Sequence, residues 1–289
     1  MRLHFIGVGK MGLPMALHLR ASGADISVSD FDAARCSLAT GQGLTVAPDA
    51  ALALRLADGV FSSLPHDAAL LQVAEQVATH SKPGTFWVDT STVSLTASAQ
   101  AAQICAGAAI EFVRTTVSGN NKMAEAAQLT VLASGPRTTY DRVLPLLQRW
   151  GENQFYLGDA EQARLMKLVI NLMIAQTSAM LGEALTLGRK GGLDWHDMWR
   201  VMGASAVASP IVKAKSAQLS ERDFSATFTV NQMVKDLDLI LGAASDHQVP
   251  LPQTAMTRQL MDAARAHGDA DADYAAIIKA VERSAGLST

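Results

Sequence analysis

Apolar and polar residues are arranged in short alternating blocks along the first part of the chain. Up to about residue 160, brief apolar runs typical of buried strands are separated by segments with apolar residues at helical spacing. Strands are expected at residues 3–8, 26–29, 60–64, 86–89, 110–113, 129–133 and 155–157. This alternation predicts an α/β fold, a doubly wound and mostly parallel sheet with helices on both faces.

After residue 158 the strand pattern ends and a helical pattern replaces it. Residues 161–190 contain no proline and are followed by Gly191-Gly192, as expected at a helix C-terminus. More helices are expected at residues 194–203, 210–220, 229–246, 252–266 and 274–284. The pattern predicts one domain at residues 1–160 and an all-helical domain at residues 161–289, joined by a long helix at residues 161–190.

A glycine-rich turn follows the first strand and precedes a helix expected at residues 13–21. In a dinucleotide-binding turn, a side chain on the first glycine would prevent the tight turn. A side chain on the second glycine would exclude the pyrophosphate, and one on the third would prevent close packing of the helix on the strand. The spacing alone is weak evidence, since such turns often only reverse the chain. In this context it predicts a Rossmann domain with cofactor contacts from Gly7, Gly9, Lys10, Met11 and Gly12.

Asp30 ends the next expected strand, near the interval of about 20 residues at which a carboxylate accepts hydrogen bonds from the adenosine ribose. The next residue is Phe31, not an arginine that could bind a 2′-phosphate. We therefore expect NAD as the cofactor in preference to NADP. Arg35 is close enough in sequence to keep NADP open.

Composition narrows the class of protein. The chain has 289 residues, of which 49% are hydrophobic and 18% charged, enough to bury one large core or two ordinary ones. Its formal net charge is −3 and it has no basic run, so neither nucleic acid nor a membrane surface is an expected partner.

The cysteines and the N-terminus indicate a cytoplasmic protein without a metal. Cys36 and Cys105 have neither C-x-x-C nor zinc spacing, and the seven histidines are scattered. Glycines, Lys10 and Pro14 interrupt the apolar N-terminus, which argues against a signal peptide. No other stretch is expected to reach the roughly 20 apolar residues of a membrane span.

Lys167 and Asn171 lie four residues apart in the long helix and therefore share a face. Such a pair alone is more often solvated than catalytic. The residues around it are almost all apolar: Met166, Leu168, Val169, Ile170, Met173 and Ile174. We expect this part of the helix to be buried, where a lysine needs a specific role.

Together these features resemble the β-hydroxyacid dehydrogenases, a family that includes 3-hydroxyisobutyrate dehydrogenase, tartronate semialdehyde reductase, glyoxylate/succinic semialdehyde reductases and L-threonate dehydrogenase. The resemblance covers essentially the whole chain. It rests on blocks in family order: Gly7 to Gly12 with Leu13-Pro14-Met15-Ala16, Leu64-Pro65, Asp89-Thr90-Ser91-Thr92, Val117-Ser118-Gly119, Lys167 with Asn171, and Lys235-Asp236.

The resemblance implies hydride transfer between a small β-hydroxy acid and a nicotinamide cofactor. Lys167 matches the family's general acid/base, which takes the hydroxyl proton during oxidation and returns it during reduction. Ser118 and Gly119 match groups that hold the substrate carboxylate, and Asn120 follows them in the same loop. The remaining substrate positions implied are Thr92, Asn171, Phe228 and Asp236, and the remaining cofactor positions are Leu64, Pro65, Thr92 and Lys235.

Each of these motifs also has a structural explanation. They could be a polar turn (Ser118-Gly119-Asn120), a helix N-cap (Ser91-Thr92), a strand exit (Leu64-Pro65), a core aromatic residue (Phe228) and a solvated helix face (Lys235-Asp236). Only their joint occurrence with Lys167 favours the catalytic interpretation.

Two segments depart from the family pattern. The family usually has Asp-Ala-Pro before Val-Ser-Gly-Gly, whereas this chain has Arg114-Thr115-Thr116 before Val117 and Asn120-Asn121-Lys122 after Gly119. The glycines that usually precede the lysine are Glu161 and Ala163, and Leu95 replaces a usual proline. These changes leave the substrate open, and Asn121 and Lys122 could meet a second polar or anionic group.

Two rival functions are considered. Imine reductases share the architecture and prefer NADPH, but they usually carry aspartate or tyrosine at the position of Lys167. The chain could also be a catalytically silent dinucleotide-binding protein. The related 6-phosphogluconate dehydrogenase is not a third candidate, because its helical domain is larger than this chain permits.

The resemblance also implies the partners of the protein, which are a small carboxylate substrate and further copies of the chain in a homodimer or homotetramer.

Overall fold

The computed structural model describes residues 1–289 and divides them into two units, Met1–Lys167 and Leu168–Thr289. The division falls inside helix α8 (Gln162–Lys190), later than the expected boundary after residue 160. Hydrogen bonds and ion pairs attach Glu161 and the first turn of α8 to the sheet of unit 1. Side-chain attachment, not the start of the helix, therefore sets the end of unit 1.

Unit 1 is built on one eight-stranded sheet with the order β3-β2-β1-β4-β5-β6-β7-β8. The strands are β1 (Arg2–Ile6), β2 (Asp25–Ser29), β3 (Thr45–Val46), β4 (Gly59–Ser62), β5 (Phe86–Asp89), β6 (Glu111–Ser118), β7 (Thr130–Ser134) and β8 (Gln154–Tyr156). All neighbours are parallel except β6 and β7. The expected doubly wound sheet is confirmed, with its switch point between β1 and β4.

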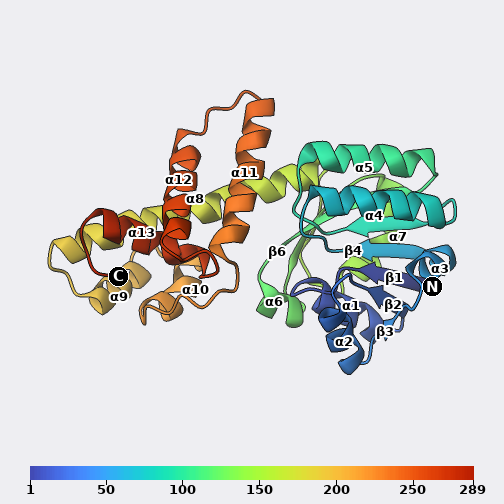
Figure 1. The fold of residues 1–289 in the computed structure, drawn as a ribbon, viewed down its shortest axis with the longest axis horizontal. Helices are drawn as coiled ribbons and strands as arrows, with labels where there is room; N and C mark the ends of the chain where they lie inside the picture. The colour runs from blue at the N-terminus through green and yellow to red at the C-terminus, as the bar shows by residue number, and fades with distance from the viewer. The chain divides into compact units, whose positions relative to one another are not determined.

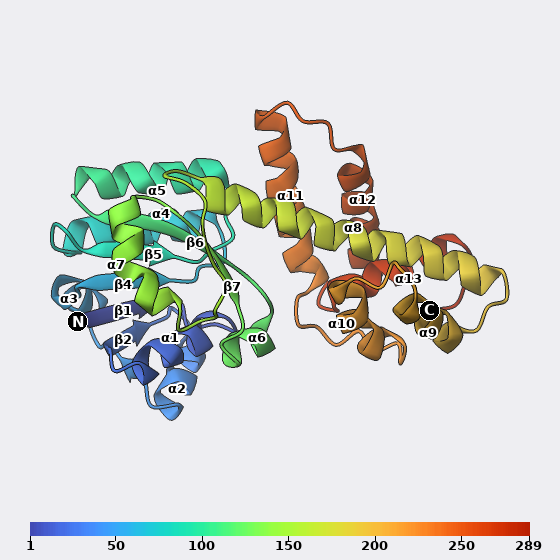
Figure 2. The same ribbon diagram turned by 180° about the vertical axis from the view of Figure 1, so that it is seen from behind.

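Helices cover both faces of this sheet (Figure 1). They are α1 (Gly12–Ala21), α2 (Ala33–Gly41), α3 (Ala50–Leu56), α4 (Asp67–His80), α5 (Leu95–Gly107), α6 (Asn121–Glu125) and α7 (Arg137–Leu147). Leu54, Leu70 and Ala101 of α3, α4 and α5 pack in one core cluster, and Leu19 and Val143 of α1 and α7 in another. The view from behind shows α7 lying across the strands (Figure 2).

Strand β6 is longer than the sequence pattern predicts. The expected strand ended at residue 113, but β6 continues to Ser118 and pairs with β7 from Arg114↔Ser134 to Ser118↔Thr130. The polar Thr115 and Thr116 hid this extension, yet both are buried, and β-branched side chains suit a strand. The extension carries the end of β6 beyond its parallel neighbour β5.

Unit 2 is helical, as expected. Besides the rest of α8 it contains α9 (Trp195–Ala204), α10 (Pro210–Leu219), α11 (Val230–Asp246), α12 (Pro252–Ala266), the 3-10 turn η1 (Tyr274–Ala276) and α13 (Ile277–Ser284). One face of α8 packs in the core through Leu168, Ala175 and Ala179, together with Ile240 and Met261.

The expectation that α8 is buried all round near Lys167 is wrong. Met166 and Val169 are exposed, and Met173 exposes 65% of its surface. Apolar residues surround the helix, but neighbouring helices cover only one face of it. The other face carries an apolar stripe that continues through Met180 and Leu187.

Helix α8 also corrects the expectation that no stretch approaches a membrane span. By length and composition it could cross a membrane, with a mean hydropathy of 1.4 over its most apolar window. Core helices of globular proteins pass the same test, and 39% of that window is buried. The feature is therefore weak evidence for a membrane segment.

His4 is fully buried in β1, where its two ring nitrogens lie 2.9 and 3.0 Å from the hydroxyls of Ser27 and Ser29 on β2. Burial lowers the pKa of His4 from 6.5 to about 4, with a smaller opposing effect from its hydrogen bond to Ser27. The imidazole is therefore neutral in the folded protein at neutral pH.

We expect this histidine to make folding sensitive to acid. Below the unfolded pKa of 6.5 the unfolded chain binds the proton first, so stability falls until about pH 4. The loss should reach about 3 kcal/mol at about 1.4 kcal/mol per pH unit. His4→Asn keeps a polar group without titrating, so urea unfolding should show a weaker pH dependence in this variant. An equal pH dependence in both proteins would contradict the assignment.

Candidate functional site

The glycine-rich turn after β1 contains two glycines that the fold itself requires. Gly7 has φ +89°, and a Cβ there would lie 2.3 Å from the carbonyl oxygen of Ser63. A Cβ on Gly12 would lie 1.9 Å from the carbonyl oxygen of Gly7. The first approach packs the turn against the end of β4, and the second packs the start of α1 against the residue that follows β1.

Gly9 is different, because nothing within the protein excludes a side chain there. The nearest atom to a Cβ on Gly9 is Arg35 Nη1 at 3.5 Å, an ordinary van der Waals distance. Helix α1 begins three residues later, and its N-cap, Met11, makes no side-chain capping bond. Helix N-terminal amides attract phosphate, and a glycine here allows a pyrophosphate to approach. The turn therefore fits a dinucleotide.

Asp30 is hydrogen-bonded to the backbone of this turn. Its Oδ2 accepts a hydrogen bond from Val8 N at 2.9 Å, its Oδ1 accepts one from Asp32 N at 3.0 Å, and its side chain is 1% exposed. Arg35 lies 3.6 Å from Asp30 and 3.5 Å from Asp32, with its guanidinium over the exposed ring of Phe31. The structure thus joins Asp30 to the turn, while Phe31 and Arg35 line its outer side.

The ends of β4 and β5 are joined to each other. Leu64 N donates a hydrogen bond to Ser91 Oγ at 2.8 Å, and Ser91 Oγ donates to Asp89 Oδ1 at 2.7 Å. Because both strands run parallel to β1, their ends lie at the same edge of the sheet as the glycine-rich turn. The segments Leu64-Pro65 and Ser91-Thr92 therefore lie at the edge where doubly wound sheets bind ligands.

Sequence reasoning missed a buried ion pair beneath these segments. Arg164 Nη2 lies 2.5 Å from Asp89 Oδ2, and neither side chain is exposed. Arg164 also donates hydrogen bonds to the carbonyl of Ser91 and, at 3.2 Å, to Ser98 Oγ. An arginine in an apolar stretch three residues before Lys167 was the available signal. The pair attaches the first turn of α8 to the end of β5.

Lys167 reaches the end of β6. Its Nζ donates a hydrogen bond to the carbonyl oxygen of Val117 at 2.8 Å, and its side chain is half-buried. Val117 precedes Ser118, so the amine lies beside the predicted carboxylate-binding loop. Gly119 has φ +137°, and Asn120 Oδ1 accepts a hydrogen bond from Met123 N at the start of α6. Within unit 1 the structure thus brings the lysine to the Ser118 loop.

In unit 2, three of the predicted site residues form a cluster. Asn171 Nδ2 donates to Asp236 Oδ2 at 2.5 Å, and Lys235 Nζ lies 3.1 Å from Asp236 Oδ1. Asn171 and Asp236 are buried. Phe228 instead packs edge-to-face on Tyr274, with ring centroids 6.1 Å apart. Asn171, Lys235 and Asp236 are thus joined by a hydrogen bond and an ion pair, whereas Phe228 is held by aromatic packing.

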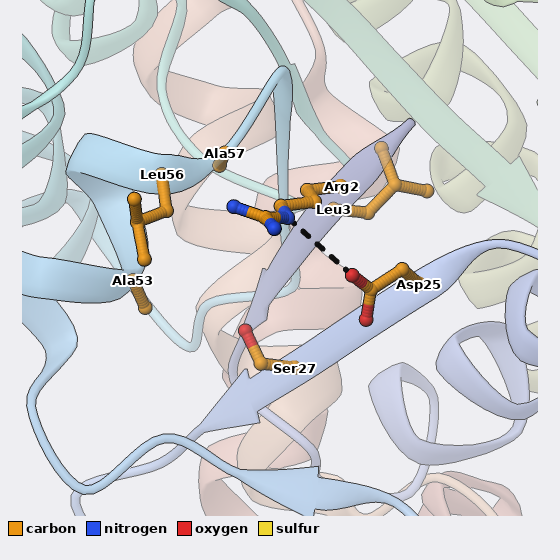
Figure 3. Close-up of a pocket in the computed structure, with 7 residues that line it drawn as sticks. All are labelled: Arg2, Leu3, Asp25, Ser27, Ala53, Leu56 and Ala57. Atoms are coloured by element: carbon orange, nitrogen blue, oxygen red, sulfur yellow. Dashed lines mark ion pairs between the residues drawn. The ribbon is translucent and has the colours of Figure 1, made fainter.

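A cavity of about 280 Å³ lies elsewhere in unit 1 and contains none of these residues (Figure 3). Its lining includes Arg2 and Asp25, which form an ion pair at 3.6 Å. Both residues begin their strands, whereas Gly7 follows the end of β1. This cavity therefore lies away from the edge that carries the candidate site.

Comparisons with known proteins agree with this arrangement. The NAD binding domain of 6-phosphogluconate dehydrogenase matches residues 2–158, and the NAD-binding domain of NADP-dependent 3-hydroxyisobutyrate dehydrogenase matches residues 162–281. The 2-(hydroxymethyl)glutarate dehydrogenase of Eubacterium barkeri is 33% identical over 99% of this chain and 97% of its own. The chain belongs to the β-hydroxyacid dehydrogenase family.

Other members of the family are also similar to it. The chloroplastic glyoxylate/succinic semialdehyde reductase 2 of Arabidopsis thaliana is 28% identical over 96% of this chain and 78% of its own. The solved 3-hydroxyisobutyrate dehydrogenase of Mycobacterium tuberculosis with L-serine has a TM-score of 0.89, with 25% identity over 96% of this chain and 98% of its own. The protein is an NAD(P)-dependent oxidoreductase that acts on a CH–OH group of a small molecule.

Gly9→Ala should separate cofactor binding from folding. The fold has room for the added methyl group, but the approaching pyrophosphate does not, so dinucleotide affinity should fall at least about tenfold with little change in thermal stability. Gly41→Ala is the control, because a Cβ there meets nothing within 4 Å and it lies in α2. Calorimetric titration with NADH and NADPH measures the affinities. Unchanged affinity in Gly9→Ala would show that the turn binds no pyrophosphate.

Proposed function

We propose that this protein is an NAD-preferring dehydrogenase that interconverts a small β-hydroxy acid and its semialdehyde or ketone, with Lys167 as general acid/base. The observation that carries the proposal is the 2.8 Å hydrogen bond from Lys167 Nζ to the Val117 carbonyl oxygen. It holds the amine next to Ser118, the expected binding group for the substrate carboxylate.

In this reaction the bound nicotinamide would supply or accept the hydride. Ser118 would hold the substrate carboxylate through its hydroxyl, and Gly119 through its backbone N–H, without burying a second charge. A neutral Lys167 amine carries two N–H groups and one lone pair. It can therefore keep its bond to Val117 while its lone pair takes the proton of the β-hydroxyl. In the reverse direction the ammonium returns that proton to the carbonyl oxygen.

Asn171 would orient the substrate near its reacting carbon. Its amide is fixed by the hydrogen bond to buried Asp236, which is itself paired with Lys235. An amide held in one orientation loses less conformational entropy when it binds a ligand. The other proposed substrate contacts are Thr92 and Phe228. The other proposed cofactor contacts are Lys10, Met11, Leu64, Pro65 and Lys235.

NAD is proposed over NADP because of the charges beside the glycine-rich turn. Arg35 is the only cation paired there, and the carboxylates of Asp30 and Asp32 already face it at 3.6 and 3.5 Å. A 2′-phosphate would bring nearly two further negative charges next to these carboxylates. The neutral ribose hydroxyl of NAD meets no such repulsion. Asp30 thus supports the preference through its charge.

We also propose that the protein forms a homodimer or homotetramer in the cytoplasm. The exposed stripe on α8 supports self-association, because Met173, Met180 and Leu187 recur at heptad spacing and are all exposed.

An activity screen tests the function. The purified protein is assayed with NAD and NADP against β-hydroxy acids, beginning with 2-(hydroxymethyl)glutarate because a relative is named for it. We expect reduction of NAD, faster than that of NADP, with at least one acid. Faster oxidation of NADPH by a cyclic imine would instead identify an imine reductase. Cofactor binding without turnover of any acid would identify a silent binding protein.

Lys167→Ala tests the proton transfer. Loss of a general acid/base typically costs 10²- to 10⁴-fold, so kcat should fall by about that factor while NADH affinity stays unchanged. Lys190→Ala, an exposed lysine at the end of the same helix, serves as the control. Turnover by Lys167→Ala at the rate of the control would refute the role of this amine.

A further inference from the structure

Two of the segments that depart from the family pattern, residues 114–116 and residues 161–163, contact each other. Arg114 on β6 donates to Glu161 Oε1 through Nε at 2.8 Å and Nη2 at 2.6 Å. Thr116, two residues further along β6, donates from Oγ1 to the carbonyl oxygen of Ala163 at 3.0 Å. We call these two contacts the β6–α8 clasp. The clasp therefore joins β6 to Glu161, which immediately precedes α8, and to the backbone of the first turn of α8.

The clasp leads directly to the proposed catalytic amine. Arg114 and Thr116 share one side of β6, since side chains alternate along a strand. Lys167 follows Ala163 by four residues, about 6 Å along the helix axis, and its amine binds Val117, the next residue of β6. The contacts of residues 114, 116 and 117 thus form one continuous series along the strand. The amine bond is the last member of that series.

The ion pair of the clasp is largely shielded from water. The side chains of Arg114 and Glu161 are only 8% and 18% exposed, and the Arg114 guanidinium also stacks on Phe112 at 5.0 Å. A shielded, two-donor arginine–carboxylate contact is stronger and more specific in direction than an exposed one. It therefore restricts the start of α8 more than glycines at positions 161 and 163 would.

We propose that the β6–α8 clasp is the positioning device that sets where the Lys167 amine lies. Arg114 and Glu161 are positioning residues, because they act through the helix and need not touch substrate. The inference rests on the proposed role of Lys167. General acid/base transfer requires hydrogen-bond distance, and a displacement of about 1 Å can reduce the rate by about 10²-fold.

The first test removes the ion pair one side at a time. Glu161→Gln and Arg114→Gln should each lower kcat at least about tenfold, with KM and NADH affinity unchanged, because the amine's position matters only in the transition state. Glu111→Gln is the matched control: Glu111 lies on the same strand and pairs with Arg142 at 3.3 Å, at the end remote from Lys167. All rates are expressed per NADH-binding site, so that poorly folded protein does not lower them.

The second test exchanges the partners. Arg114→Glu combined with Glu161→Arg reverses the charges but keeps the pair, and it should recover most of the kcat lost in the single variants. A swapped protein that binds NADH but remains as slow as the single variants would contradict the inference. So would single variants with unchanged kcat, or with losses confined to KM.

The outcomes also separate this inference from the proposed function. If Lys167→Ala turns over normally, the lysine mechanism itself is wrong. If Lys167→Ala is inactive while Glu161→Gln and Arg114→Gln match Glu111→Gln, the mechanism stands and only the positioning role fails.

Discussion

The hydrogen bond between the Lys167 amine and the Val117 carbonyl is the interaction on which the proposed chemistry depends. It joins the first turns of α8 to the end of β6, beside the loop that begins at Ser118. A lysine side chain is long and flexible, so in isolation its amine would sample many positions. Here a backbone acceptor at the end of β6 holds the amine beside the loop proposed to bind the substrate carboxylate.

The surroundings of this bond explain why the start of α8 belongs to unit 1. The buried pair of Arg164 and Asp89 is favourable only if the desolvated charges find further partners. Asp89 accepts hydrogen bonds from Ser62 and Ser91, and Arg164 also donates to the Ser91 carbonyl. The ends of β4 and β5 and the first turn of α8 are therefore held together. The segments proposed to face the cofactor and to transfer the proton are thus attached to each other by side-chain contacts.

The sequence predicted most of the fold because the strands and helices follow simple periodicity. It underestimated β6, since Arg114 to Thr116 read as polar and only the structure shows them buried against β7 and α8. It also predicted that the part of α8 around Lys167 is buried on every side, because apolar residues all round a helix do not reveal which face neighbouring helices cover. Periodicity reports local patterns, whereas the covering of a face depends on distant segments.

For the site, the family motifs predicted Lys167 and Ser118 as members of one substrate site, and the interval after the glycine-rich turn predicted Asp30 as a cofactor contact. They could not predict the partners of Arg114 or Arg164, because these contacts join residues 47 and 75 positions apart. Nor could they predict that Asp30 is covered by the turn it holds. Such pairings arise from three-dimensional packing and leave no spacing signal in one sequence.

A crystal structure of the protein with NADH and its substrate acid analogue bound would test the central claim most directly. The account predicts that Lys167 Nζ lies within hydrogen-bond reach, about 2.6–3.2 Å, of the substrate's β-oxygen while keeping its contact to Val117. An amine farther from that oxygen than one bridging water can span, or turned into solvent, would contradict it.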